Sequence, residues 1–232
     1  MDEVNDAVVT IALLYPELLG TYGDGGNARV LAHRATVRGI DAEVVAVSAS
    51  DPLIAADIYL LGGGEDGPQR YACEALRRSD FVRRIDDGAI VLAVCAGLQI
   101  LGTSFCVEGD DAYAGLAVVD AVTVRGDTRA VGELRVDVGG SLLVGFENHG
   151  GRTTVQATPP LGDVVHGVGN DGVVDGFRHH NVIATYAHGP VLALNPWLAD
   201  DLLSRALGAP LEPHRSVADQ LYAQRCRVLG GN

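Results

Sequence analysis

The chain has 232 residues, of which 47% are hydrophobic and 20% charged, as in an ordinary folded soluble protein. Its formal net charge is -13, so binding to nucleic acid or to an anionic membrane surface is not expected. All 17 basic residues are arginine. The absence of lysine excludes a phosphate-binding loop that ends in Gly-Lys-Ser/Thr and a Schiff-base lysine. We therefore expect no ATP site in this chain.

The cysteines and the N-terminus point to a cytoplasmic protein. Cys73, Cys95, Cys106 and Cys226 include no pair with the short spacing of a zinc site, so no metal is expected. The N-terminus is acidic and lacks the apolar run of a secretory signal. No stretch reaches the roughly 20 apolar residues that a membrane-spanning helix needs. We expect reduced thiols and no membrane insertion.

Short apolar runs alternate with helical patterns along the first hundred residues. The apolar runs predict strands at residues 8–14, 44–47, 58–61 and 89–94. The helical patterns cover residues 27–38, 69–86 and 98–101. This alternation predicts an α/β fold with a doubly wound, mostly parallel sheet and helices on both faces.

The pattern changes after residue 107. Shorter β segments are predicted between residues 117 and 146, with turns at 125–127 and 139–140. Further strand character appears at Val155, at 164–165 and at 182–186, and a helix is predicted over 197–207. With no internal repeat and no low-complexity linker, we predict a single domain over residues 1–232.

Cys95 is the first candidate for chemistry, because a buried strand leads directly into Cys95-Ala96-Gly97 and a following helix. This order is typical of a nucleophile elbow, in which a tight turn with small neighbours lifts the side chain off the sheet edge. The positive end of the helix would stabilise a thiolate. The alternative is a buried cysteine with a structural role only.

His188 is the second candidate. It follows the predicted strand at 182–186, so it should lie at the same carboxyl edge of the sheet as Cys95. A cysteine and a histidine brought together from distant sequence are the expected pair of a thiol enzyme. His149, in the glycine-rich stretch 145–153, is the competing base. We favour His188, because strand ends hold side chains more firmly than glycine-rich loops do.

The segments LGGGED at 61–66, VCAGLQ at 94–99 and YAHGP at 186–190 resemble class I glutamine amidotransferases of the cobyric acid synthase branch. The stretch GFENHGGRT at 145–153 is more specific, and it resembles the glutaminase subunits of lipid II isoglutaminyl synthases. So does the segment at 18–27, which ends in YGDGGN. The similarity runs in order over nearly the whole chain.

The resemblance implies roles for six residues. Cys95 would be the nucleophile and His188 the base, and the amides of Gly63 and Ala96 would stabilise the oxyanion. Gln99 would contact glutamine, and Arg129 would hold the substrate carboxylate. Without the resemblance, Arg129 would be a surface arginine in a turn. The resemblance also implies a glutaminase that releases ammonia from L-glutamine through a thioester.

The segment after His188 departs from the common pattern of class I amidotransferases. Most of them carry His-Pro-Glu, and the glutamate orients the histidine, whereas Gly189 and Pro190 follow here. Asp24 and Glu147 are alternatives within this chain, but each is more simply a cap or turn residue. We therefore expect a partner subunit to donate the acid. The partner would then raise glutamine hydrolysis at least tenfold, roughly 1.4 kcal/mol of barrier.

Ammonia needs an acceptor, and this chain is not expected to activate one. By resemblance, the partner is a Mur-ligase-like amidoligase that carries ATP and Mg²⁺ and amidates D-glutamate of lipid II in peptidoglycan synthesis. The two chains would then form a heterodimer. The alternatives are another acceptor, such as a corrinoid, a stand-alone hydrolase or chaperone with the same elbow, and a degenerate fold kept for binding.

Overall fold

The computed structural model describes residues 8–106 and 111–229. Within them, one six-stranded sheet is formed by β1 (Val9–Leu14), β2 (Ala42–Val47), β3 (Ile58–Leu61), β4 (Ile90–Val94), β11 (Phe177–His179) and β12 (Val182–Thr185). The strand order is β11-β12-β4-β3-β1-β2. All of these strands run parallel except β11, which pairs antiparallel with β12. The prediction of a mostly parallel sheet is confirmed.

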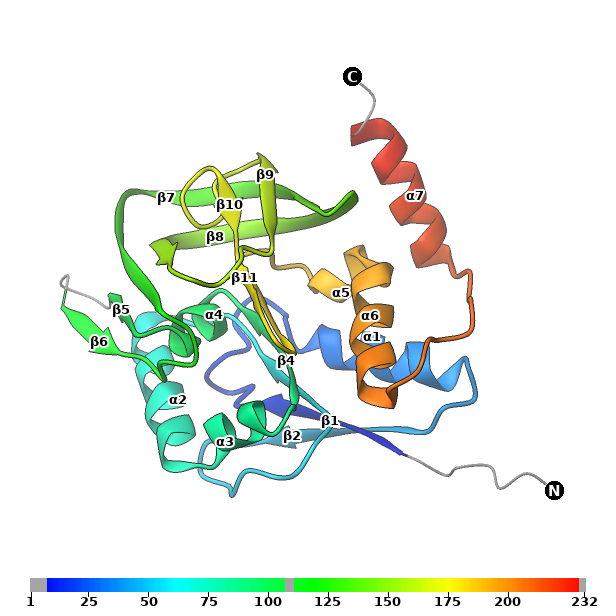
Figure 1. Cartoon of the computed structure of the whole chain (residues 1–232), viewed down its shortest axis with the longest axis horizontal. Helices are drawn as coiled ribbons and strands as arrows, with labels where there is room; N and C mark the ends of the chain where they lie inside the picture. The colour runs from blue at the N-terminus through cyan, green and yellow to red at the C-terminus, as the bar shows by residue number, and fades with distance from the viewer. Residues whose placement is uncertain (1–7, 107–110, 230–232) are drawn as a thin grey trace.

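Helices cover both faces of this sheet. The helices of the described residues are α1 (Gly26–Thr36), α2 (Asp66–Arg78), α3 (Phe81–Asp86), α4 (Ala96–Leu101), α5 (Val191–Leu194), α6 (Pro196–Leu207) and α7 (Val217–Leu229), of which α7 lies away from this sheet. Figure 1 shows α2 and α3 on one side of the strands and α1 and α6 on the other. None of the helices in the described residues is long and apolar enough to cross a membrane.

The predicted single helix over 69–86 is wrong, because Ser79 divides it into α2 and α3. Ser79 has an extended backbone, with φ -93° and ψ 179°. Its hydroxyl donates to the carbonyl of Leu76 at 2.8 Å and accepts from the amide of Phe81 at 3.1 Å. A serine side chain that satisfies free backbone groups in this way ends one helix and begins the next.

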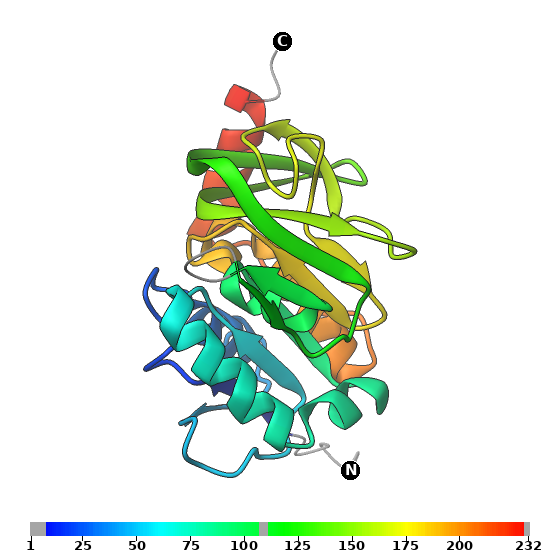
Figure 2. The ribbon, with the colours of Figure 1, turned by 90° about the vertical axis from the view of Figure 1, so that its left-hand side faces the viewer.

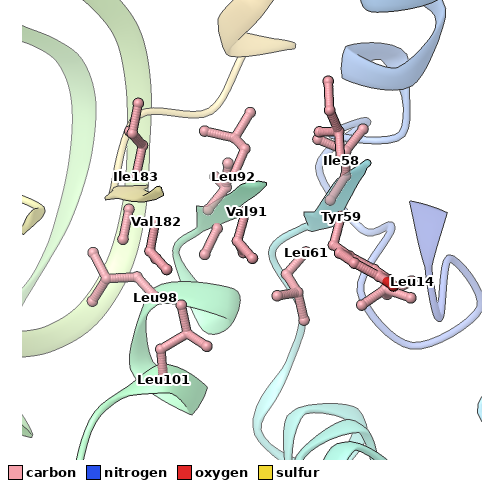
Figure 3. Packing of buried hydrophobic residues seen from close by; sticks show 14 of the residues in the cluster. Leu14, Ile58, Tyr59, Leu61, Val91, Leu92, Leu98, Leu101, Val182 and Ile183 are labelled. Carbon is pink, nitrogen blue, oxygen red and sulfur yellow. The ribbon is translucent and has the colours of Figure 1, made fainter. Parts of the chain in front are cut away.

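The core lies between the central strands and the helices. Every residue of β3, β4 and β12 is buried, which explains why these strands are continuous apolar runs rather than alternating ones. Figure 3 shows Val91 and Val182 on neighbouring strands, with Leu98 and Leu101 of α4 close to them. Burying one such side chain contributes about 1.5–3 kcal/mol. This packing fixes the strand ends from which the candidate site residues project.

A second sheet was not predicted. It contains β5 (Ser104–Cys106), β6 (Ala112–Ala114), β7 (Ala121–Val138), β8 (Ser141–Val155), β9 (Gly162–His166) and β10 (Val174–Asp175). Figure 2 shows β7 and β8 lying across the molecule above the α/β layer. The predicted turn at 125–127 is instead a register shift within β7, between Arg125 and Ala130. The turn at Gly139 and Gly140 is confirmed, and both residues have positive φ.

Candidate active site

Cys95 joins β4 to α4 at the carboxyl end of the central sheet. Its φ of 52° lies in the left-handed region, which residues other than glycine rarely adopt. Two hydrogen bonds hold the turn: the Cys95 amide donates to the Thr185 carbonyl at 2.9 Å, and the Gly97 amide to the Gly62 carbonyl at 3.2 Å. Backbone strain of about 1–3 kcal/mol persists only where the surroundings enforce it. Cys95 therefore has the backbone predicted for a nucleophile elbow.

The backbone of His188 is held by the second sheet. Its amide donates to the carbonyl of Phe146 at 2.8 Å, and its carbonyl accepts from the Phe146 amide at 3.1 Å. Gly145, the preceding residue of β8, allows this approach, because a Cβ atom there would lie 2.6 Å from the Cβ of Ala187. Strand β8 thus fixes the position of the histidine that follows β12.

The imidazole of His188 is bound on one side by a carboxylate. Its Nδ1 lies 2.9 Å from Oδ2 of Asp24, and both residues are 2% exposed. A carboxylate oxygen accepts hydrogen bonds, so Nδ1 carries the hydrogen. The other nitrogen, Nε2, is buried without a hydrogen-bond partner among the described residues. It is the nitrogen left to act on Cys95.

The surroundings of His188 favour its charged form. Burial lowers the pKa of His188, but the Asp24 carboxylate and the Cys95 side chain outweigh burial and raise this pKa to about 9. The ring of Tyr22 lies against the imidazole, with 4.6 Å between centroids. An imidazole that keeps its proton at neutral pH can pair with a thiolate and then donate the proton to a leaving group.

A polar cavity of about 390 Å³ is lined by Cys95. Gln99 and Arg129 also line it, together with Glu65 and His149. A larger cavity of about 1150 Å³ lies against α2 and is lined by no cysteine or histidine. Among residues 8–106 and 111–229, no group of three or more His, Cys, Asp and Glu side chains is placed to hold a metal ion. The smaller cavity is therefore the candidate active site.

Residues 10–196 match the family of CobB/CobQ-like glutamine amidotransferase domains. The chain belongs to this family. The amidotransferase is 34% identical to subunit GatD of the lipid II isoglutaminyl synthase (glutamine-hydrolyzing) of Staphylococcus aureus, over 95% of this chain and 94% of that protein. It is 34% identical to GatD of Streptococcus pneumoniae, over 86% and 80%. The resemblance inferred from the sequence motifs is confirmed.

More distant relatives share part of the amidotransferase. The cobyric acid synthase of Bacteroides fragilis is 33% identical over 66% of this chain, which covers 32% of that protein. A crystal structure of a glutamine amidotransferase superimposes with a TM-score of 0.54 at 19% identity, over 84% of this chain and 98% of the other. PurLQS from Thermotoga maritima gives 0.54 at 13% identity, over 93% and 99%. The predicted fold class is confirmed.

A partner was expected to donate the acid for His188, because no acid follows the histidine in the sequence. In the structure, the carboxylate of Asp24 from this same chain lies beside Nδ1 of His188. The sequence suggested a cap or turn role for Asp24. However, the N-cap of α1 is Gly25, and no side chain caps this helix. A signal was available: Asp24 lies in a loop after β1, and such loops meet at the carboxyl edge of the sheet, as Cys95 and His188 do.

The oxyanion role of Gly63 stays a prediction, and the structure gives its amide another partner. Its amide donates to Oδ2 of Asp24 at 2.9 Å, so this N–H is already used. Gly64, the next residue of the loop, lines the cavity. Ala96 is the first residue of α4, and its N–H therefore has no acceptor within the helix. A role for the Ala96 amide at the oxyanion stays a prediction.

Gln99 lies in the wall of the cavity as part of a buried hydrogen-bond chain. Its Nε2 donates to the hydroxyl of Tyr186 at 3.1 Å, and its Oε1 accepts from Nε2 of Gln69 at 2.9 Å. The Tyr186 hydroxyl also lies 2.7 Å from Oγ1 of Thr153. Both ends of the Gln99 amide are thus engaged by protein, and its contact with substrate stays a prediction.

Arg129 is beside the cavity rather than in an isolated surface turn. It lies in β7 at the register shift, and its Nε donates to Oδ1 of Asn148 at 2.6 Å. One Nη donates to the hydroxyl of Tyr22 at 3.2 Å. These bonds direct the guanidinium toward the cavity that Cys95 lines. Binding of the substrate carboxylate by Arg129 stays a prediction.

His149, the competing base, is fully engaged elsewhere. Its Nε2 lies 3.2 Å from Oε2 of Glu147, and its Nδ1 lies 3.0 Å from the carbonyl of Gly151. The ring stacks on Tyr186, with centroids 3.8 Å apart. Both nitrogens face acceptors, so neither is left to serve Cys95. This arrangement favours His188 as the base, as the sequence suggested.

Proposed function

We propose that this amidotransferase is a glutaminase subunit. It hydrolyses L-glutamine to glutamate and ammonia through a thioester on Cys95, and it passes the ammonia to an amidoligase partner. The observation that carries the proposal is Cys95 on a strained elbow, with a buried His188 whose pKa lies above its usual value, at a cavity that Arg129 also lines. This arrangement suits acyl transfer from a small amide substrate.

The first half of the reaction forms the thioester. The Cys95 sulfur attacks the side-chain carbonyl carbon of glutamine, and the carbonyl electrons move to oxygen. Backbone N–H groups at the elbow, that of Ala96 first, stabilise the oxyanion. The protonated Nε2 of His188 gives its proton to the amide nitrogen, the C–N bond breaks, and ammonia leaves.

The second half regenerates the enzyme. His188, now neutral at Nε2, takes a proton from a water molecule that attacks the thioester carbon. The C–S bond breaks, glutamate is released, and the sulfur returns as a thiolate beside protonated His188. Arg129 holds the α-carboxylate of the substrate throughout, through charge-assisted hydrogen bonds.

The partner we propose is a Mur-ligase-like subunit that binds ATP and Mg²⁺ and amidates D-glutamate of lipid II. This proposal is supported by the extent of the alignment with a subunit of lipid II isoglutaminyl synthase. The GatD relative from Staphylococcus aureus aligns over 95% of this chain and 94% of its own length. The chain spans about a third of the Bacteroides fragilis cobyric acid synthase it matches. A corrinoid acceptor is therefore the second candidate.

The test of the nucleophile is glutamate release by the purified chain. Cys95→Ala and Cys95→Ser should each abolish hydrolysis, because the proposed thioester forms on the Cys95 sulfur. Cys106→Ser is the matched control, since Cys106 lines the same cavity, and it should keep hydrolysis. A diazoketone analogue of glutamine should label Cys95 alone. Activity in Cys95→Ala, or labelling of Cys106 instead, would contradict the mechanism.

The partner is tested by copurification and reconstitution. The tagged chain should retain a protein with a Mur-ligase nucleotide-binding domain. The pair should amidate lipid II from glutamine, ATP and Mg²⁺, and ammonium chloride should replace both glutamine and this chain. Amidation of a corrinoid rather than lipid II would favour the second candidate. Turnover of peptides without glutamine hydrolysis would indicate the stand-alone hydrolase.

A further inference from the structure

Tyr22 lies in the segment YGDGGN between β1 and α1, and the mechanism above gives it no role. It is partly buried, and it lines the same cavity as Cys95. A tyrosine offers a flat apolar ring and a hydroxyl that can both donate and accept a hydrogen bond. Both parts of Tyr22 contact residues to which the proposed reaction assigns a role.

The hydroxyl of Tyr22 lies between two opposite charges. It is 3.1 Å from Oε1 of Glu65 and 3.2 Å from Nη2 of Arg129. A carboxylate can only accept and a guanidinium can only donate, so the hydroxyl donates to Glu65 and accepts from Arg129. Burial and the Glu65 carboxylate raise the pKa of Tyr22, so the phenol keeps the hydrogen that it donates.

The Arg129 guanidinium is held along one edge only. Its Nε donates to Oδ1 of Asn148 at 2.6 Å, and its Nη2 donates to the carbonyl of Asn148 at 3.3 Å as well as to Tyr22. Nη1 has no acceptor among the described residues. The edge formed by Nε and Nη2 is thus fixed by protein, and the Nη1 donors remain for a carboxylate.

The ring of Tyr22 packs on the imidazole of His188. The two ring centroids are 4.6 Å apart, with the planes inclined at 49°. Gly63 completes this group, because a Cβ atom there would lie 3.0 Å from Cδ2 of Tyr22 and 2.4 Å from Cε1 of His188. Only glycine fits beside both rings. Packing by Tyr22 therefore limits how far the imidazole can turn.

We propose that Tyr22 is a positioning residue with two separable roles in the glutaminase reaction, a role that rests on the proposed function. Its hydroxyl, oriented by Glu65, fixes the guanidinium of Arg129 for the α-carboxylate of glutamine. Its ring confines the imidazole of His188 for proton transfer. Tyr22 thus links the group that binds the substrate to the group that transfers the proton, and Glu65 acts on binding through Tyr22.

The first test separates the hydroxyl from the ring by steady-state kinetics of glutamate release in the full-length chain. Tyr22→Phe keeps the ring, so KM for glutamine should rise about tenfold, or roughly 1.4 kcal/mol, and kcat should stay within about twofold. Tyr22→Leu removes the ring as well. Its kcat should also fall about 10- to 100-fold, because small displacements of reacting groups slow the chemical step.

The second test asks whether Glu65 acts through Tyr22. Glu65→Gln should raise KM by itself, because an amide can donate to the phenol oxygen and disturb its bond to Arg129. In the Tyr22→Phe background the same substitution should have no further effect on KM, since the hydroxyl that Glu65 orients is absent. Additive effects would overturn the proposal, because Glu65 would then act on the substrate without Tyr22. This double variant also decides the matter if Tyr22→Leu fails to fold.

The matched control is Tyr71→Phe, which removes the hydroxyl of a tyrosine that is 75% exposed on α2. It should keep the wild-type KM and kcat. A wild-type KM in Tyr22→Phe, or an equal loss of kcat in Tyr22→Phe and Tyr22→Leu, would overturn the proposal. A wild-type chain that hydrolyses no glutamine would instead contradict the proposed function itself. These two failures are therefore distinguishable.

Discussion

At the scale of single residues, the site depends on close approaches that few side chains allow. Cys95 has a positive φ without being glycine, and Gly63 lies where any side chain would meet the His188 ring. Both features cost conformational freedom or strain, and both place reactive atoms next to one another. Substitutions at the cavity should therefore show which residues affect KM for glutamine and which affect kcat.

Arg129→Ala should weaken the use of glutamine about 10- to 100-fold in kcat/KM, mainly through KM. The reason is the loss of charge-assisted hydrogen bonds to the α-carboxylate, worth about 1.5–3 kcal/mol. Steady-state kinetics of glutamate release measures the effect. Arg125→Ala is the control, because Arg125 lines the same cavity with the same charge. An equal loss in both variants would point to the general positive potential rather than to a specific contact.

At the scale of elements, the two sheets meet at the end of β12. The Phe146–His188 bridge joins them through the backbone. Asp175, at the end of β10, adds a side-chain link: its carboxylate accepts the Thr185 hydroxyl at 2.5 Å and the Tyr186 amide at 3.1 Å. The strand end that leads to His188 is therefore fixed from the second sheet.

Asp175→Asn should change how stability depends on pH. Burial raises the pKa of Asp175 to about 6, and the bonds from Thr185 and Tyr186 only partly oppose it. A raised carboxyl pKa contributes stability below the unfolded value of about 3.9 and loses it as pH rises toward 6. The variant lacks this loss, so its stability relative to wild type should rise by about 2 kcal/mol between pH 4 and 6.

Urea unfolding at several pH values measures this change. Asparagine cannot accept both hydrogen bonds through one carbonyl oxygen, so the variant should still be destabilised by about 1–3 kcal/mol at pH 4. A deficit that is constant from pH 4 to pH 6 would show that Asp175 keeps the same charge in the folded and unfolded chain.

At the scale of the whole molecule, an ion pair links α7 to α1. No residue of α7 is buried. Arg34 of α1, which is 3% exposed, donates to both carboxylate oxygens of Asp200 in α6, at 2.7 and 2.6 Å. It also reaches Asp219 of α7 at 3.3 Å. One buried guanidinium thus joins the first helix to the last two.

Arg34→Met should destabilise the fold by about 1–3 kcal/mol, less than a fully buried pair because the two aspartates are partly exposed. Residues 217–229 should exchange amide hydrogens faster, as measured by mass spectrometry, while glutamine hydrolysis persists. Arg83→Met, in the exposed pairs with Asp80 and Asp87, should cost less than about 1 kcal/mol. Unchanged exchange in α7 would show that its apolar contacts suffice.

The local features of the fold could be predicted because they are encoded in neighbouring residues. The apolar runs predicted β1, β3, β4 and β12 within one or two residues, since a buried strand needs consecutive apolar side chains. The small residues after Cys95 predicted the elbow for the same local reason. The second sheet was less visible, because its strands are partly exposed and interrupted by a register shift that resembles a turn.

The way in which distant groups meet could be seen only in the folded chain. Asp24 and His188 are 164 positions apart, and nothing near Asp24 distinguishes a carboxylate that caps a helix from one that crosses the sheet edge to a histidine. The engagement of the Gly63 amide and of His149 is likewise set by residues far along the chain. Local patterns were enough to predict which strand ends carry the cysteine and the histidine. The choice of acid required the packed sheets, because a hydrogen bond depends on distances of tenths of an ångström that local patterns do not specify.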